Sequence, residues 1–246
     1  MSDGDDPLAR KLGAFEPLGP EETFMLETLQ KSRARIAAGK EVVYEGQQHR
    51  CAYILRSGWA CSYKRIRDGG RQIIDIQIPG DFLGLRSLLL RSSDHSFVTL
   101  TEVEVAKVYP EQMLDVFRLT PRLAVALLWA VSRDEAMVVE HLVGIGRRDA
   151  LERTAHFLLE LGARLKLVGY GTGDSYPCPV SQSVLADTLG MTAIHLNRVL
   201  RQLREARLVV FRENTVVFPD IERTAEITGF ELSYLDQGSP AWNLSL

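Results

Sequence analysis

The hydrophobic and polar positions of this chain follow three successive patterns. Residues 8–35 hold two short helical patterns, which are interrupted by Pro17 and Pro20. From Gly39 to Val108, short β-rich runs alternate with turn residues, as in VVY, AYIL, WACSY, IIDIQI and FVTLTEVEVAKVY. Strands at this spacing are typical of an antiparallel sandwich or barrel. From Leu123 onward the apolar positions recur mostly with helical spacing.

One long helix is expected from Leu123 to about Ile145, where Gly144 and Gly146 should break it. It has two apolar stripes. The first is Leu128, Val131, Val138, Leu142 and Ile145, and the second is Leu123, Leu127, Ala130 and Met137. A helix that is apolar on two sides needs two partners, so one stripe can cover the β-rich region and the other can meet a second copy of the chain. A helix buried within one chain is the alternative. A further amphipathic helix is expected over Arg147–Leu167.

Residues 180–209 predict two short helices that are joined by a tight turn. Ser181 can cap the first helix and Thr192 the second, and Gly190 suits a positive φ between them. The apolar positions, which should be buried, are Val184, Leu185, Leu189, Leu196, Val199, Leu200 and Leu203. Two helices joined in this way form a helix-turn-helix, although an ordinary helical hairpin in a core has the same pattern.

The exposed face of the second helix favours DNA binding over a core hairpin. It carries Ala193, Ile194, Asn197, Arg198 and Arg201, with His195 and Arg204 at its flanks. These side chains can donate to base edges and phosphates, and no acidic residue lies between Thr192 and Arg204. Before these helices, residues 168–179 can form a small hairpin. After them, VVFRENTVVF predicts two strands with a turn near Glu213-Asn214, which is the wing of a winged helix.

Composition and charge place this chain among globular proteins with a mildly basic C-terminal module. Of the 246 residues, 46% are hydrophobic and 25% charged, and no apolar run approaches the length of a membrane span. The N-terminus lacks the apolar region of a secretory signal, so a cytoplasmic protein is expected. Residues 147–213 contain 10 Lys/Arg and 7 Asp/Glu, a balance of +3, whereas the remainder has 19 and 25, a balance of −6. This asymmetry suits a DNA-binding module on an acidic body.

These elements occur in the order found in the Crp/Fnr superfamily of bacterial transcription regulators. The turn glycines Gly39, Gly46, Gly58 and Gly80 and the stretch PGDFLGL resemble the β-roll of that family. GRRDALERTAHFLLELGARL resembles the helix that leads into its DNA-binding domain, and residues 180–209 resemble its helix-turn-helix. The tail DIERTAEITGFELSYL is similar to a C-terminal extension of an α-proteobacterial branch. The resemblance implies an α+β fold with an N-terminal antiparallel β-roll, a long dimerisation helix and a C-terminal winged helix-turn-helix.

The resemblance also implies a function. Ser181–Thr188 would cross the DNA backbone and Thr192–Arg204 would enter the major groove of double-stranded DNA. A homodimer on palindromic promoter sites, contact with RNA polymerase and no enzymatic activity are implied as well. Members that read TGTGA-type half-sites have Arg and Glu at the positions of Ala193 and Ile194, so a different half-site is expected here. The residues assigned to DNA binding are Ser181, Gln182, Thr192, Ala193, Ile194, His195, Asn197, Arg198 and Arg201.

The residues of the effector pocket depart from those of the cyclic-nucleotide-sensing members. Those members bind the ribose through a Gly-Glu pair and the phosphate through an Arg-Ser or Arg-Thr pair. Here the first pair is Gly84-Leu85, followed by Arg86, and the second is His95-Ser96. Leucine cannot accept a hydrogen bond, and neutral histidine replaces a phosphate-binding arginine poorly. We therefore expect a diverged pocket that does not bind cAMP.

Cysteines and histidines indicate no metal centre. The iron–sulfur sensors of the family need N-terminal cysteines, whereas the first cysteine here is Cys51 and three thiolates cannot complete a four-thiolate site. If the chain turns back at Ser57-Gly58, Cys51 and Cys61 do not face each other and form no disulfide. Cys178, between two prolines, is either an incidental loop cysteine or an accessible redox-active thiol. Histidines 49, 95, 141, 156 and 195 lack metal-ligand spacing, while haem ligation stays open.

The sequence thus predicts a homodimeric transcription regulator without an identified cofactor or effector. We expect a β-roll domain over residues 1–118, a dimerisation helix over 119–146, a winged helix-turn-helix over 147–218 and a C-terminal extension over 219–246. One alternative is the same fold controlled by expression level or cysteine redox alone. Another is a cupin-like metal enzyme, although the two histidines of the roll lie too far apart for the usual H-x-H pair. A third is a cyclic-nucleotide-controlled interaction module, which the missing Glu and Arg oppose.

Overall fold

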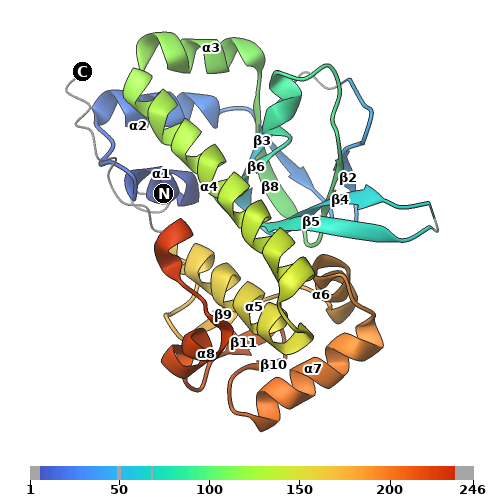
Figure 1. Ribbon diagram of the computed structural model, residues 1–246. Coiled ribbons are helices and arrows are strands. Elements are labelled where there is room, and N and C mark those ends of the chain that lie inside the picture. Colours follow the sequence, from blue (N-terminus) through green and yellow to red (C-terminus); the bar gives the residue numbers. More distant parts are fainter. Residues whose placement is uncertain (1–5, 49–50, 68, 236–246) are drawn as a thin grey trace. The chain divides into compact units, whose positions relative to one another are not determined.

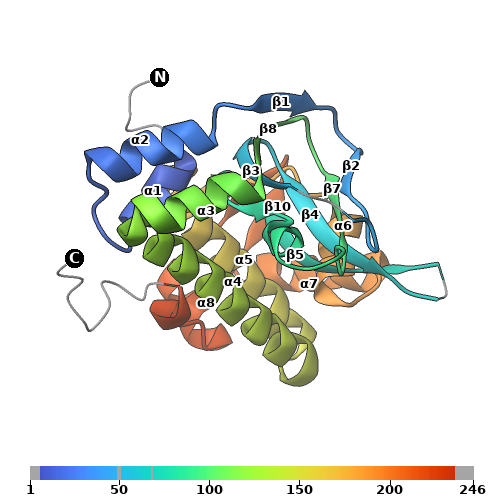
Figure 2. The ribbon, with the colours of Figure 1, turned by 90° about the horizontal axis from the view of Figure 1, so that it is seen from above.

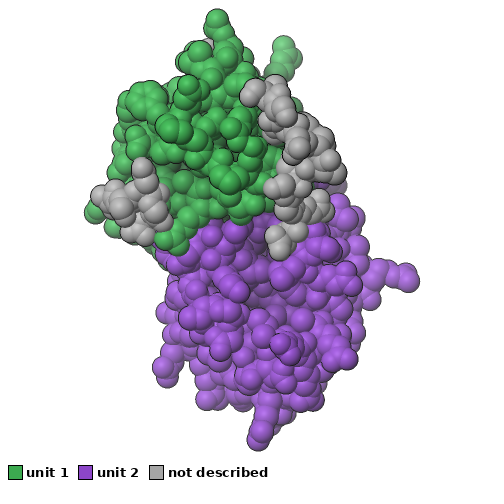
Figure 3. Space-filling model, turned by 90° about the vertical axis from the view of Figure 1, so that its left-hand side faces the viewer, with its two compact units in different colours: residues 1–64, 74–132, 237–246 green, residues 65–73, 133–236 purple. Residues whose placement is uncertain are grey.

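A computed structural model describes residues 6–48, 51–67 and 69–235 (Figure 1). Contacts divide these residues into two compact units (Figure 3). Of the described residues, the first unit comprises those up to Lys64 and Ile74–Ser132, and the second comprises Arg65–Ile73 and those from Arg133 to Leu235.

The first unit has two four-stranded sheets, ordered β1-β8-β3-β6 and β2-β7-β4-β5, with antiparallel pairing. The strands are β1 (Arg33–Ile36), β2 (Glu41–Val43), β3 (Ala52–Ser57), β4 (Ala60–Arg65), β5 (Arg71–Gln77), β6 (Phe82–Leu83), β7 (Ser96–Thr99) and β8 (Val103–Val108). Side chains from both sheets form one apolar core, in which Val43, Leu55 and Phe97 are buried. The predicted antiparallel β-region is therefore present. Strand β1, with two arginines at its exposed positions, was not among the predicted runs.

The chain passes from one sheet to the other at Gly58. Strand β3 pairs with β6 and β8, whereas β4 pairs with β7, so the hairpin that the comparison of Cys51 with Cys61 assumed at Ser57-Gly58 does not form. Gly58 has a φ of 82°, and a Cβ atom there would lie 2.2 Å from the carbonyl oxygen of Glu102. The crowding at this crossing requires glycine. Cys51 and Cys61 are both buried, and neither forms a disulfide with a described residue.

Helices of the first unit form a second apolar core against β3 and β8 (Figure 2). These helices are α1 (Pro7–Gly13), α2 (Pro20–Leu29), α3 (Pro110–Leu119) and the first part of α4 (Pro121–Arg147), and a 3-10 helix, η2, spans Leu85–Leu88. Leu12, Leu29, Leu123 and Leu127 are among the buried residues of this core. The second apolar stripe of the long helix is thus buried as predicted.

Helix α4 continues through both of its late glycines. It ends at Arg147, so the prediction that Gly144 and Gly146 break it is wrong. A glycine costs a helix only about 1 kcal/mol relative to alanine, which is too little to end a long helix. Gly144 is buried, and a Cβ atom there would lie 3.6 Å from Cγ of Arg153 on the following helix. A Cβ atom at that distance would make an ordinary van der Waals contact, so the packing there does not require glycine.

The second unit contains the rest of α4, three further helices around a small sheet, and α8. The helices are α5 (Ala150–Leu167), α6 (Gln182–Leu189), α7 (Ala193–Glu205) and α8 (Ile221–Thr228), followed by a 3-10 helix, η3 (Leu232–Tyr234). The sheet has the order β10-β11-β9, from β9 (Ser175–Pro177), β10 (Val210–Arg212) and β11 (Thr215–Val217). Because β9 pairs with β11, the small hairpin expected within residues 168–179 is wrong. The wing turn at Glu213-Asn214 is present, and both residues have a positive φ, as a two-residue hairpin turn requires.

Candidate nucleic-acid interface

Helices α6 and α7 have the caps and the turn that the sequence predicts. Oγ of Ser181 accepts a hydrogen bond from the backbone N–H of Val184 at 3.3 Å. Oγ1 of Thr192 accepts one from the N–H of His195 at 3.2 Å. Between the helices, Gly190 has a φ of 64°. These three local features define where each helix begins and where the first one ends.

The apolar stripes of both helices are buried, and this leaves one polar face of α7 in solvent. The buried residues are Val184, Leu185, Leu189, Leu196, Val199, Leu200 and Leu203. The exposed residues are Thr192, Ala193, Ile194, His195, Asn197, Arg198, Arg201 and Arg204. Ile194, an apolar residue near the start of α7, is 72% exposed. The face therefore offers one apolar contact together with several hydrogen-bond donors.

The side chains of Asn197 and Arg201 on this face have hydrogen-bond partners within the chain. Nδ2 of Asn197 donates to Oε1 of Gln182 at 3.1 Å, across the turn between the helices. Nε of Arg201 donates to Oε1 of Glu205 at 2.7 Å. The side chains of Arg198 and His195 make no hydrogen bond or ion pair with the residues that the structure describes. An unpaired guanidinium at this position is available for a bidentate contact with a guanine or a phosphate.

Helix α4 exposes the apolar stripe that the sequence assigns to a second copy. Leu128, Val131, Val138, Leu142 and Ile145 are between 41% and 71% exposed. Val139 and Val143, which the sequence analysis did not include, are exposed on α4 as well. Exposed apolar surface of this extent on one helix is typical of a protein–protein contact.

The effector-pocket residues lie around a carboxylate that the sequence analysis missed. Asp94 accepts from Nη1 of Arg86 at 3.1 Å, and its other oxygen lies 2.7 Å from Nδ1 of the buried His95. Burial by itself would raise the pKa of Asp94, but His95 and Arg86 outweigh it and hold that pKa below its ordinary value. Burial lowers the pKa of His95 despite this carboxylate. Arg86 therefore already has an anionic partner.

The remaining pocket residues form a backbone turn or bond to the backbone of the roll. Gly84 has a φ of 70° and precedes η2, which begins at the half-buried Leu85. Oγ of Ser96 accepts from the backbone N–H of Glu45 at 2.9 Å. The structure thus brings Arg86 and His95 together through Asp94 and gives Ser96 a backbone partner.

Comparison with known proteins finds a matching domain family for each half of the chain. The family described as Cyclic nucleotide-binding domain matches residues 33–119, and the Crp-like helix-turn-helix domain matches residues 152–227. The nitrogen fixation regulation protein FixK of Rhizobium meliloti is 31% identical over 177 residues, which are 71% of this chain and 76% of that protein. The chain belongs to the Crp/Fnr family. It is therefore a DNA-binding transcription regulator and not an enzyme.

Two further relatives agree with the Crp/Fnr assignment. The transcriptional activatory protein AadR of Rhodopseudomonas palustris is 27% identical over 216 residues, covering 87% of this chain and 88% of that protein. The solved structure of FixK2 from Bradyrhizobium japonicum has a TM-score of 0.70 at 24% identity, covering 79% of this chain and 96% of that one. At this identity the structural likeness supports the fold.

The structure corrects the expected environment of Cys178. Its side chain is only 1% exposed, so the accessible thiol on which a redox role would depend is absent. Burial raises the pKa of this thiol to about 11. A thiol with such a pKa is almost entirely protonated near pH 7 and reacts slowly, because the thiolate is the nucleophile.

Among the described residues, no three His, Cys, Asp or Glu side chains are grouped so that they could hold a metal ion. His49, one of the two roll histidines, lies outside the described residues. No helix in the part of the chain that the structure describes is both long and apolar enough to cross a membrane.

Proposed function

We propose that this Crp/Fnr regulator acts as a homodimer that inserts α7 into the major groove of palindromic promoter DNA. The observation that carries the proposal is the exposed face of α7, where Arg198 has no partner among the described residues and no carboxylate precedes Glu205. Arg198 is assigned to a guanine edge and Ile194 to a thymine methyl group. Ser181, Gln182, Thr192 and His195 are assigned to phosphates, and Ala193, Asn197 and Arg201 complete the contact surface.

The homodimer is supported by the exposed stripe of α4. Exposed Leu, Val and Ile side chains along one helix are stabilised when a second copy covers them. A twofold-symmetric pair of helices would present two copies of α7 to one face of the duplex. Palindromic half-sites one helical turn apart fit that symmetry.

The roll is proposed not to bind cAMP. Leu85 stands where an acceptor for the ribose hydroxyl would be needed, and it offers no hydrogen-bonding atom. A phosphate that approached Arg86 or His95 would meet the negative charge of Asp94, which already pairs with both. Regulation through a different effector or through the amount of the protein fits these residues, whereas the burial of Cys178 opposes redox control at that thiol.

The four segments are proposed to divide these tasks. Residues 1–118 form the roll domain, 119–146 the dimerisation helix, 147–218 the DNA-binding domain and 219–246 the extension, of which residues 236–246 lie outside the described chain. RNA polymerase is the proposed further partner and the cytoplasm the proposed location, as follows from promoter binding.

Enrichment of bound duplexes from a random library tests the DNA proposal. The expected result is a palindromic consensus with half-sites about 10–11 base pairs apart. The library should also be selected with a variant in which Ile194 and Arg198 are both replaced by Ala, which leaves the buried stripe of α7 intact. That variant should enrich a weaker consensus that lacks the positions read by Ile194 and Arg198. Failure of the wild-type protein to enrich any sequence, or a consensus without twofold symmetry, would contradict the proposal.

A further inference from the structure

The last described segment of the chain contacts two helices of the second unit. We call residues 230–235, which include η3, the clasp segment. The hydroxyl of Tyr234 donates to Oε2 of Glu160 on α5 at 2.8 Å. Nε of Arg133 on α4 donates to the carbonyl oxygen of Leu235 at 2.9 Å. The clasp segment is therefore bonded to both α4 and α5.

Aromatic packing adds to these hydrogen bonds. The ring of His156 on α5 lies parallel to that of Tyr234, with centroids 6.3 Å apart and planes 7° apart. Phe230 meets the same imidazole edge-on at 5.1 Å. Leu235 is only 4% exposed. Phe230, Tyr234 and Leu235 thus anchor the clasp segment by ring contacts and burial, whereas the three residues between Phe230 and Tyr234 are exposed.

Besides the bond between Arg133 and Leu235, the carboxylate of Glu160 connects the clasp segment to α4, because it is bonded to both. Glu160 is completely buried, and its Oε1 lies 2.8 Å from Nε2 of His141 on α4. Because an ionised carboxylate can only accept, Nε2 carries the hydrogen. His141, Arg164 and Tyr234 together outweigh the burial that would raise the pKa of Glu160. One buried charge thus requires a donor from α4 and a donor from the clasp segment at the same time.

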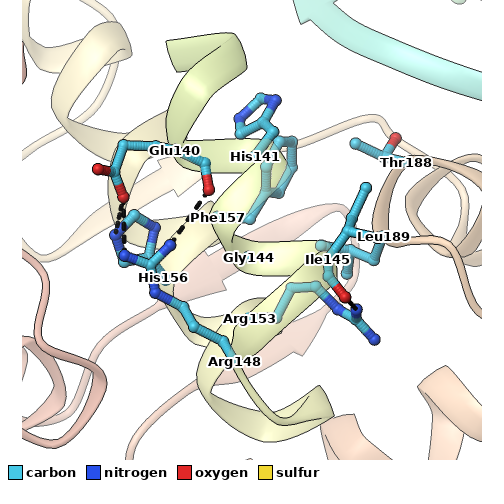
Figure 4. A pocket seen from close by; sticks show the side chains of 10 residues that line it. All are labelled: Glu140, His141, Gly144, Ile145, Arg148, Arg153, His156, Phe157, Thr188 and Leu189. Atoms are coloured by element: carbon cyan, nitrogen blue, oxygen red, sulfur yellow. Dashed lines mark hydrogen bonds and ion pairs between the residues drawn. The ribbon is translucent and has the colours of Figure 1, made fainter. Parts of the chain in front are cut away.

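The rest of the joint between α4 and α5 is also polar (Figure 4). Nη2 of Arg148 donates to Oε2 of Glu140 at 2.7 Å, and Nε2 of His156 lies 3.7 Å from the same oxygen. Nη1 of Arg153 donates to the carbonyl oxygen of Ile145 at 3.2 Å. Hydrogen bonds are directional, so a joint of this kind is sensitive to the angle between its helices. The adjoining cavity is only about 20 Å³, roughly the space of one water molecule.

We propose that the clasp segment holds the C-terminal half of α4 at a fixed angle to α5 and thereby limits which spacing of DNA half-sites the dimer accepts. Helix α4 carries the exposed stripe with Val138 and Leu142, and α5 packs against the recognition helix α7. The angle between α4 and α5 therefore governs the separation of the two copies of α7. The DNA part of this inference rests on the proposed function, whereas the clasp itself does not.

Two truncations test the proposal on the otherwise full chain. One ends after Leu235 and keeps the clasp segment, and the other ends after Gly229 and removes it. Amide hydrogen exchange over residues 133–147 should become about tenfold faster in the shorter chain only, since it loses a hydrogen bond to a buried charge. On palindromes whose half-site spacing is changed by one or two base pairs, the shorter chain should lose most of the preference for the best spacing. The chain that ends after Leu235 should match the full chain in both measurements.

Single substitutions guard against a general loss of folding. Tyr234→Phe removes only the hydroxyl that donates to Glu160. It should change amide hydrogen exchange and half-site spacing preference in the same direction as the chain that ends after Gly229. Tyr170→Phe is the matched control, because the Tyr170 hydroxyl has no hydrogen bond to any described residue. Unchanged exchange in both Tyr234→Phe and the shorter chain would overturn the clasp. Faster exchange with an unaltered spacing preference would overturn its role in spacing. Failure of the full chain to bind any palindrome would instead contradict the proposed function, while the exchange data would still decide on the clasp.

Discussion

Arg201 and Glu205 form an ion pair one turn apart on α7, with Nε of the arginine 2.7 Å from Oε1 of the glutamate. Arg198, on the same exposed face, has no such partner among the described residues. In the protein without DNA, Arg201 is therefore paired with a carboxylate, and Arg198 is paired with no described residue. Glu205 accepts from Nε of Arg201 and partly neutralises its charge, whereas no described residue does so for Arg198.

Replacing Arg198 with Ala should reduce specific DNA binding by about 1–3 kcal/mol per half-site and relax the preference at one base pair. The reason is the loss of a bidentate contact with guanine O6 and N7. Binding at fixed salt to the selected palindrome, to its single-base variants and to scrambled DNA measures both effects. Equal losses on specific and scrambled DNA would mean that Arg198 only neutralises phosphate.

Two controls separate base contacts from phosphate contacts. Arg201→Ala, which removes an arginine that is also exposed but is paired with Glu205, should have a smaller effect than Arg198→Ala. His195→Ala should weaken binding to all sequences alike, because His195 lies at the start of α7 and is assigned to a phosphate. A base-specific loss in His195→Ala would reverse that assignment.

The double substitution Val138→Asp and Leu142→Asp should dissociate the dimer. Each unpaired carboxylate that the contact buries costs about 3 kcal/mol or more. Sedimentation velocity at micromolar concentration should show a dimer for the wild type and a monomer for the double variant. Leu114→Asp is the control, since Leu114 on α3 is 61% exposed and Leu142 is 71% exposed. A monomeric wild type, or a double variant that stays dimeric, would contradict the role of this stripe.

Titration calorimetry with cAMP and with cGMP should show no binding at physiological concentrations. Leu85 offers no acceptor for the ribose, and Asp94 repels the phosphate. The same preparation should bind its palindrome, which establishes that the protein is folded. A micromolar dissociation constant for either nucleotide would contradict the assignment of the pocket residues.

Stability should decrease as the pH falls below about 6.5, in part because of His156. Burial, followed by the charge of Arg148, lowers the pKa of His156 from 6.5 to about 4. Between these values the unfolded chain binds the proton and the folded chain does not, so stability rises with pH across this window. The full effect is about 3 kcal/mol. Urea unfolding at several pH values should show a flatter profile for His156→Phe.

The matched histidine for this measurement is His195, which is exposed. His195→Ala should keep the wild-type dependence of stability on pH. A profile for His156→Phe that is as steep as that of the wild type would mean that other groups, such as His95, dominate.

The helix-turn-helix could be predicted from sequence because its determinants are local. Ser181, Gly190 and Thr192 act on backbone groups within three or four residues, and the buried stripe of α7 follows from helical periodicity. The same holds for the two stripes of α4, one buried and one exposed as predicted. Strand β1 was missed because its alternation is carried by two arginines rather than by apolar residues.

Relationships between distant segments required the tertiary structure. Neighbouring β-runs predict a hairpin, yet β3 and β4 lie in different sheets, because strand pairing is decided by packing across the whole roll. Glycines at 144 and 146 predict a helix end, but the packing of α4 outweighs their small intrinsic cost. Cys178 lies in a loop sequence and is nevertheless buried.

The sequence by itself determined the caps, turns and amphipathic faces of α4, α6 and α7, since each depends on residues within about one or two helical turns. Only the tertiary structure decided that Asp94 pairs with Arg86 and that Glu160 accepts hydrogen bonds from both His141 and Tyr234. His141 and Tyr234 lie 19 and 74 residues from Glu160, and no periodicity connects them. Such pairs exist because a carboxylate enclosed by the folded chain must find donors wherever the fold provides them.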